Sequence, residues 1–189
     1  MALAKDDPER DALEALARGD VARTLTVLMS AYGDDVFRHC RAMVGTDDLA
    51  NDVHQQVFIQ AFRDLATFSR RSTFRTWLYA IARHRCLDAL KLCRRFRRRF
   101  LLAPRLPERG DPTPRADEDL SARAEIERLE RALARLKPKV RAAVLLRFQE
   151  GMTFEEMAEI CHEAPGTLQA RVARALPVLR RALEEDRDE

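Results

Sequence analysis

The 189-residue sequence lacks the features that mark secreted, membrane-spanning and metal-binding proteins. No run approaches the ~20 apolar residues of a membrane span, and the N-terminal MALAKDDPER has no apolar signal-peptide core. The four cysteines, Cys40, Cys86, Cys93 and Cys161, show no CxxC spacing, and no histidine stands in zinc-finger spacing to them. We therefore expect a cytoplasmic protein with free thiols, no metal and no other cofactor.

Catalytic motifs and strand patterns are missing as well. The sequence contains no Gly-x-Ser-x-Gly, no phosphate-binding loop and no His-Glu-x-x-His, so we expect that the protein is not an enzyme. β-branched residues do not alternate with polar ones, and apolar residues recur at steps of three and four. This periodicity predicts an all-α fold.

A proline-rich segment divides the chain. Residues 101–119 hold four of the eight prolines, together with Gly110 and mixed charge. Such a composition cannot form a core and predicts a flexible linker. We therefore expect two small helical domains, an N-terminal one over residues 1–100 and a C-terminal one over residues 120–189.

The N-terminal domain is expected to contain a stack of amphipathic helices. Glycines and helix-capping residues set their ends. The expected helices run over Pro8–Arg18, over Asp20–Met43 with an interruption near Gly33, from Thr46–Asp48 to about Leu65, and from Thr73 to about Arg99.

The last of these helices ends in a basic run, Arg94-Arg95-Phe96-Arg97-Arg98-Arg99. A charge run is usually a solvated helix face. Five arginines in six residues exceed what solubility requires, and clustered arginines release counterions when they neutralise phosphates. The run therefore favours contact with nucleic acid.

The C-terminal domain carries a helix-turn-helix pattern. Thr153 and Glu156 form a Thr-x-x-Glu capping box, and a turn over Glu163–Gly166 leads to a helix that Thr167 could cap. In such a motif the start of the second helix enters the major groove, where Gln pairs with adenine and Arg with guanine. A plain helical hairpin would explain this segment alone equally well. The candidate DNA-contacting residues are Thr167, Gln169, Ala170, Arg171 and Arg174, and Pro177 is expected to kink or end the helix.

Three ordered segments resemble one known family. They are DLANDVHQQVFIQAF (48–62), FSRRSTFRTWLYAIARHRCLDAL (68–90), and LKPKVRAAVLLRFQEGMTFEEMAEI followed by PGTLQARVARAL. Together they resemble the extracytoplasmic-function (ECF) group of bacterial RNA polymerase sigma factors, within the sigma-70 family. The resemblance spans about residues 20–95 and 125–183, and three motifs in order are more specific than a lone helix-turn-helix.

The resemblance implies a function for each domain. The N-terminal domain would be region 2-like and bind core RNA polymerase and the melted −10 element. The C-terminal domain would be region 4-like and bind the double-stranded −35 element, and an anti-sigma factor is a further candidate partner. Binding energy would open the strands, because unstacked bases are held by polar or aromatic pockets and arginines.

The resemblance also implies site residues, and the sequence departs from the family at some of them. The family commonly has other residues at the positions of Gln56, His84 and Gln169-Ala170. The helical spacing of Trp77 favours a structural place in the core over a DNA contact. The polymerase-binding candidates are Asp52, Val53, Gln55, Gln56 and Phe58. The −10 candidates are Ser69, Arg70, Arg71, Ser72, Arg75, Arg83 and His84.

Two other functions compete with this interpretation. A free-standing helix-turn-helix regulator would bind duplex DNA without polymerase, but it leaves the 68–90 match unexplained. A decoy would bind polymerase or an anti-sigma protein without initiating transcription. Initiation by purified polymerase distinguishes all three.

Overall fold

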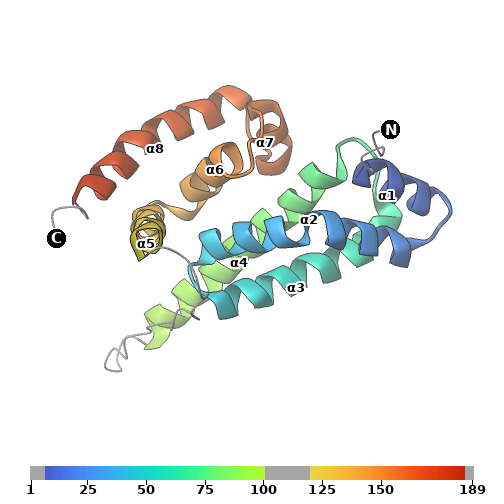
Figure 1. Ribbon diagram of the computed structural model, residues 1–189, viewed down its shortest axis with the longest axis horizontal. Helices are drawn as coiled ribbons and strands as arrows, with labels where there is room; N and C mark the ends of the chain where they lie inside the picture. The colour runs from blue at the N-terminus through green and yellow to red at the C-terminus, as the bar shows by residue number, and fades with distance from the viewer. Residues whose placement is uncertain (1–6, 101–119, 186–189) are drawn as a thin grey trace.

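The computed structural model describes residues 7–100 and 120–185, and these form helices without any strand (Figure 1). The predicted linker, 101–119, lies outside the described residues, as do residues 1–6 and 186–189. The helices are α1 (Pro8–Ala17), α2 (Val21–Val44), α3 (Asp47–Asp64), α4 (Phe74–Phe100), α5 (Leu120–Ala134), α6 (Pro138–Phe148), α7 (Phe154–Cys161) and α8 (Pro165–Glu185), with a 3₁₀ turn over Leu65–Thr67. The all-α prediction is confirmed.

In the N-terminal half, α2, α3 and α4 lie side by side and α1 crosses one end (Figure 1). Asp20 caps α2 through its side chain, and Gly45 ends α2 at φ 91°, a left-handed conformation that costs glycine little. Gly33 does not interrupt α2. Fully buried apolar side chains from α2, α3 and α4 form the core of this half, and they include Leu28, Val57, Phe74 and Leu78.

The start of α4 is capped by a residue from α1. The carboxylate of Glu9 accepts hydrogen bonds from the backbone N–H groups of Phe74 at 2.9 Å and Arg75 at 3.0 Å. It also accepts one from the Tyr32 hydroxyl at 2.9 Å. Burial and this hydrogen bond raise the pKa of Tyr32. A carboxylate at a helix N-terminus satisfies unpaired N–H groups and the positive end of the helix dipole.

In the C-terminal half, α7 and α8 form a helix-turn-helix. The predicted capping box is present, because Thr153 and Glu156 bond reciprocally. The expectation that Thr167 caps the last helix is wrong, since α8 begins two residues earlier at Pro165, and proline is favoured in the first turn. Nor does Pro177 end the helix, which continues to Glu185.

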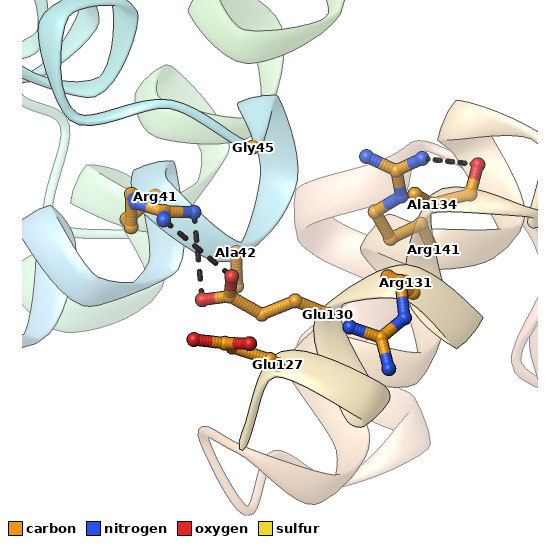
Figure 2. Close-up of a pocket in the computed structure, with 8 residues that line it drawn as sticks. All are labelled: Arg41, Ala42, Gly45, Glu127, Glu130, Arg131, Ala134 and Arg141. Carbon is orange, nitrogen blue, oxygen red and sulfur yellow. Dashed lines mark hydrogen bonds and ion pairs between the residues drawn. The ribbon is translucent and has the colours of Figure 1, made fainter. Parts of the chain in front are cut away.

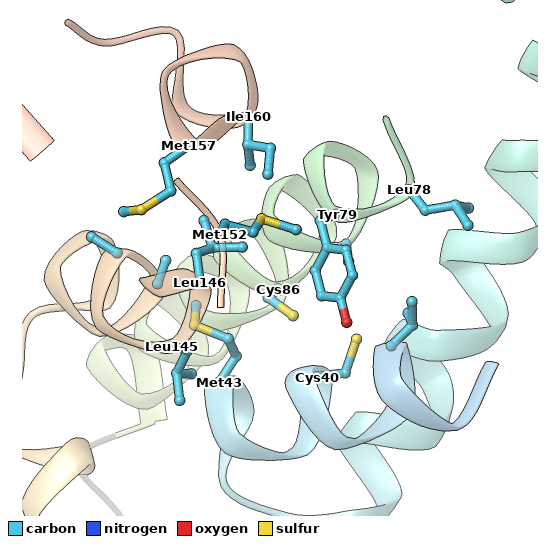
Figure 3. Packing of buried hydrophobic residues seen from close by; sticks show 14 of the residues in the cluster. Cys40, Met43, Leu78, Tyr79, Cys86, Leu145, Leu146, Met152, Met157 and Ile160 are labelled. Carbon is cyan, nitrogen blue, oxygen red and sulfur yellow. The ribbon is translucent and has the colours of Figure 1, made fainter. Parts of the chain in front are cut away.

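The two halves pack against each other, which the sequence patterns did not predict. α7 and α6 lie on α4 and α2, and the fully buried Met152 belongs to one hydrophobic cluster with Tyr79 and Met43 (Figure 3). Arg141 of α6, 8% exposed, donates to the carbonyl of Met43 at the end of α2 at 2.7 Å. A fully buried methionine side chain contributes about 1.5–3 kcal/mol. This interface therefore stabilises one arrangement of the halves.

Candidate polymerase and DNA interfaces

One face of α3 presents a short polar row. Asp52, Gln55 and Gln56 are exposed, whereas Val53 and Phe58 are 1% and 5% exposed and belong to the core. The buried pair holds the helix on α2, and the polar three face away from the core. Among the five residues expected to bind polymerase, the three polar ones are therefore those that face solvent.

An apolar groove borders this polar row. Leu25 and Met29 of α2 line it together with Ile59 and Phe62 of α3, and Gln55 stands at its edge. Met29, Ile59 and Phe62 are 45%, 52% and 50% exposed, although they are large apolar side chains. Contiguous exposed apolar surface of this kind usually marks a protein-binding site.

The loop before α4 is anchored by stacked aromatic rings. The Phe68 ring lies 4.4 Å from that of Phe74 and 5.2 Å from that of Trp77, between ring centroids. Trp77 is partly buried and packs against the core, as its spacing indicated. This stacking fixes the position of Phe68, where the loop begins, against the first turn of α4.

The tip of this loop exposes the residues expected to meet the −10 element. Ser69, Arg70 and Arg71 are exposed, and Ser72 is partly so. Arg70 has φ 56°, which is uncommon for a residue with a side chain. Such backbone conformations persist where surrounding structure fixes them, and they cluster at binding sites.

Two of the predicted DNA-binding arginines on α4 face the other half of the protein. Arg75 donates a hydrogen bond to the Glu150 carbonyl, and its guanidinium lies 5.6 Å from the centroid of the Tyr79 ring. Arg83 lies against Cys161 at the end of α7, where burial raises the pKa of the thiol and Arg83 opposes that shift. His84, by contrast, is exposed. In this arrangement Arg75 and Arg83 are not free to meet DNA.

The first turns of α8 present the predicted recognition surface. Thr167, Gln169, Ala170 and Arg174 are exposed, and Leu168 and Val172 hold the helix on the core. Arg174 bonds the carbonyl of Ala170 one turn earlier at 3.0 Å. The exposed residues lie on the outer face, where a major groove could reach them.

Arg171 differs from its neighbours because it is already paired. Its guanidinium donates two hydrogen bonds to Glu163, one of them at 2.9 Å from Nη1. The pairing lowers the pKa of Glu163 and raises that of Arg171. Bidentate pairing fixes the plane of the guanidinium. Arg171 is therefore held by the turn that precedes its helix.

Glu150, which the sequence analysis did not single out, is the centre of the interface between the halves. Its side chain is 5% exposed, accepts a hydrogen bond from the Tyr79 hydroxyl and lies 3.4 Å from Nδ1 of the fully buried His39. Burial and the bond to Glu150 raise the pKa of Tyr79. No local motif distinguishes Glu150 from an exposed loop residue, because its partners in the N-terminal half are 71 or more residues away in the chain.

A second contact between the halves lies at the end of α2. Arg41 is ion-paired with Glu130 of α5 at 3.4 Å (Figure 2). It is also ion-paired with Asp47. Arg141 bonds the carbonyls of Leu133 and Ala134, both at 2.8 Å. A pocket of about 270 Å³ lies between the halves, and its lining includes Arg41, Glu130 and Arg141.

Comparison with known proteins places this geometry in a family. The model of Sigma-70 region 2 matches residues 28–98, and that of Sigma-70, region 4 matches residues 126–176. The ECF RNA polymerase sigma factor SigC of Mycobacterium tuberculosis is 33% identical over 187 residues, which cover 98% of this chain and 97% of that protein.

Solved structures share the fold. CnrH, in complex with the cytosolic domain of CnrY, has a TM-score of 0.70 at 23% identity, over 95% of this chain and 99% of that one. The sigma factor RpoE of Bartonella quintana, in complex with the anti-sigma factor NepR, has a TM-score of 0.67 at 22% identity, over 82% and 94%.

A region 2 on α2, α3 and α4, followed by a region 4 that contains a helix-turn-helix, defines an RNA polymerase sigma factor of the sigma-70 type. With SigC matched over almost its whole length, the chain belongs to the ECF RNA polymerase sigma factors. It binds core polymerase and directs promoter recognition and strand opening at initiation. Neither a free-standing regulator nor a decoy is favoured. No helix in the described part of the chain is long and apolar enough to cross a membrane.

Proposed function

We propose that residues 1–100 form the domain that binds core polymerase and the −10 element, and that residues 120–189 form the domain that binds the −35 element. Residues 101–119 would join them. One observation carries the division of labour: the exposed polar residues of the two matched regions lie on separate surfaces, on α3 and α4 and at the start of α8. No catalytic step is needed, and the place of action is the cytoplasm, where RNA polymerase works.

Polymerase docks on the polar row of α3 and the groove beside it. Asp52, Gln55 and Gln56 supply acceptors and donors that orient the partner. The exposed Ile59 and Phe62 supply the apolar area that most of the affinity requires. The same groove would suit an anti-sigma factor, which would then compete with polymerase.

The −10 element is captured at the start of α4. The exposed loop residues Ser69, Arg70 and Arg71 can hold unpaired bases and the phosphates between them. The −35 element is read by Gln169 and Arg174, with Thr167 and Ala170 beside them on the exposed face of α8. Because Arg75 donates a hydrogen bond to Glu150 and Arg83 lies against Cys161 across the interface between the halves, those contacts must be exchanged when these arginines bind DNA.

Abortive initiation by purified core polymerase tests this proposal. With the protein present, we expect short transcripts from a subset of a random promoter pool, and we expect none with core alone. Substitutions in α8 should change the selected promoter sequences only at the −35 element. Substitutions in residues 69–71 should change them only at the −10 element. Binding to duplex DNA without transcripts would contradict the proposal.

A further inference from the structure

The last turns of α4 carry a strong positive charge that the proposed contacts do not use. Residues 91–99, here called the basic arm, contain six lysines and arginines and no acidic residue. Lys91, Arg94, Arg95 and Arg99 are exposed, and the arm extends past the neighbouring helices (Figure 1). Lys91 pairs with Asp88 at 2.9 Å, whereas neither Arg94 nor Arg95 has a partner among the residues that the structure describes.

A helix with this sequence is costly in the free protein. Like charges at positions i and i+4, such as Lys91 with Arg95 and Arg95 with Arg99, destabilise a helix by a few tenths of a kcal/mol each. Cationic side chains near a C-terminus recover part of this through the helix dipole. A polyanion alongside the helix would remove the repulsion altogether.

The arm is joined rigidly to residues proposed to meet DNA. α4 is one helix from Phe74 to Phe100, so its axis carries the start and the arm in a single line. From Arg83 to residues 94–99 the helix rises about 16–24 Å. That rise corresponds to at most about five to seven base pairs of duplex at 3.4 Å each.

We infer that the basic arm binds the phosphate backbone of double-stranded promoter DNA, in the spacer between the −35 and −10 elements. This inference rests on the proposed function, which places the start of α4 at the −10 element. Duplex is favoured because arginine contacts with phosphates need only regularly spaced charge. The spacer is the duplex segment that such a rigid rod reaches.

The salt dependence of promoter binding measures these contacts. We compare holoenzyme containing the wild-type protein with holoenzyme containing the double variant Arg94→Gln, Arg95→Gln, on one promoter selected from the random pool. Each phosphate contact contributes about 0.9 to the slope of log K against log salt, so the double variant should lose about 1.8 from the slope. The matched control, Arg18→Gln with Arg23→Gln, removes two exposed arginines elsewhere and should leave the slope unchanged.

The native thiol on the arm locates the contact. Cys40, Cys86 and Cys161 are buried, whereas Cys93 is partly exposed and can carry an iron–EDTA cleavage reagent. With labelled holoenzyme we expect cuts in the duplex spacer, and these should vanish in Cys93→Ser. Cuts only in melted DNA or in the transcript, or an unchanged salt slope, would overturn the inference.

A membrane surface is the other target that a basic helix with exposed apolar residues could bind. Leu92 and Phe96 are 68% and 61% exposed and lie one turn apart. The arm would bind lipid and not DNA if two results were obtained together. The protein would bind anionic phosphatidylserine vesicles only when Arg94 and Arg95 are present, and the salt dependence of promoter binding would be unchanged in the double variant. Failure of the proposed function looks different, because the holoenzyme would then produce no selective transcripts at all.

Discussion

The Tyr79 hydroxyl donates a hydrogen bond to the carboxylate of Glu150 and so joins α4 to the loop between α6 and α7. Arg75, one turn before Tyr79, donates to the carbonyl of the same Glu150. A single loop residue therefore engages both a core tyrosine and an arginine that we expect to meet promoter DNA. The proposed contact of Arg75 with promoter DNA therefore requires that its bond to Glu150 be exchanged.

Glu150→Gln should loosen the packing of the two halves. The amide retains the shape but loses the negative charge beside His39 and weakens the bond from Tyr79, and buried bonds to a charged group are worth about 1.5–3 kcal/mol. We expect a lower free energy of unfolding, a larger radius of gyration by small-angle scattering and tighter binding to duplex promoter DNA. Glu155→Gln, at an exposed position of α7, is the control. Unchanged scattering and DNA affinity would contradict the role given to Glu150.

Asp52→Arg should weaken polymerase binding without unfolding the protein. Asp52 is exposed on α3, and reversing its charge opposes a partner complementary to the polar row. Such mismatches typically cost on the order of ten- to a hundredfold in affinity. Fluorescence titration with labelled core polymerase measures the loss. Asp34→Arg makes the same charge change on exposed α2 and should bind normally; equal losses would indicate a general electrostatic effect.

Gln169→Ala should relax selectivity at one base pair of the −35 element. A good bidentate contact discriminates by about 1–3 kcal/mol, or roughly five- to 150-fold. Initiation from templates randomised across the −35 element, followed by sequencing, would show the relaxed position. Arg180→Gln lies eleven residues further along α8 and should leave the sequence preference intact. A uniform loss at all positions would mean that Gln169 supports the fold and does not read bases.

The Glu163–Arg171 pair predicts a pH-dependent contribution to stability. Arg171 lowers the pKa of Glu163 in the folded protein, so the pair stabilises the fold above the unfolded-state pKa, about 4.3. The contribution is lost as pH falls through the lower folded-state value. The wild-type protein should therefore have a higher melting temperature than Glu163→Gln at pH 7, and this difference should disappear in acid. Glu159→Gln, at an exposed position, should show no such gap at any pH.

Local features of the fold were predictable, and contacts between the halves were not. Thr153 and Glu156 are three residues apart, so their reciprocal capping is visible in the sequence. Pro165 and Thr167 both suit a helix start, and α8 begins at Pro165. Glu150 and Arg141 act on residues far away in the chain, and an amphipathic pattern does not reveal which partner an apolar or charged face will meet.

The candidate site residues also include some whose environment was predictable from the sequence and some whose environment was not. Exposure of Asp52 and Gln169 follows from helical periodicity, because the apolar stripe fixes which side faces outward. Pairing of Arg171 with Glu163 depends on the shape of the turn between α7 and α8, which the sequence specifies only through its folded geometry. The capping of α4 by Glu9 likewise required α1 to cross the end of the bundle.

Because α4 is one uninterrupted helix, the rotational positions of the residues at its two ends are fixed relative to each other. Each inserted residue would turn everything beyond it by about 100° and advance it by about 1.5 Å. An insertion of one residue after Asp88 would therefore rotate Arg94 and Arg95 about the helix axis relative to the start of α4. An insertion of seven residues, close to two full turns, would restore their direction while shifting them by about three base pairs. The angular phase of the helix, and not only its charge, thus sets which part of a promoter it meets.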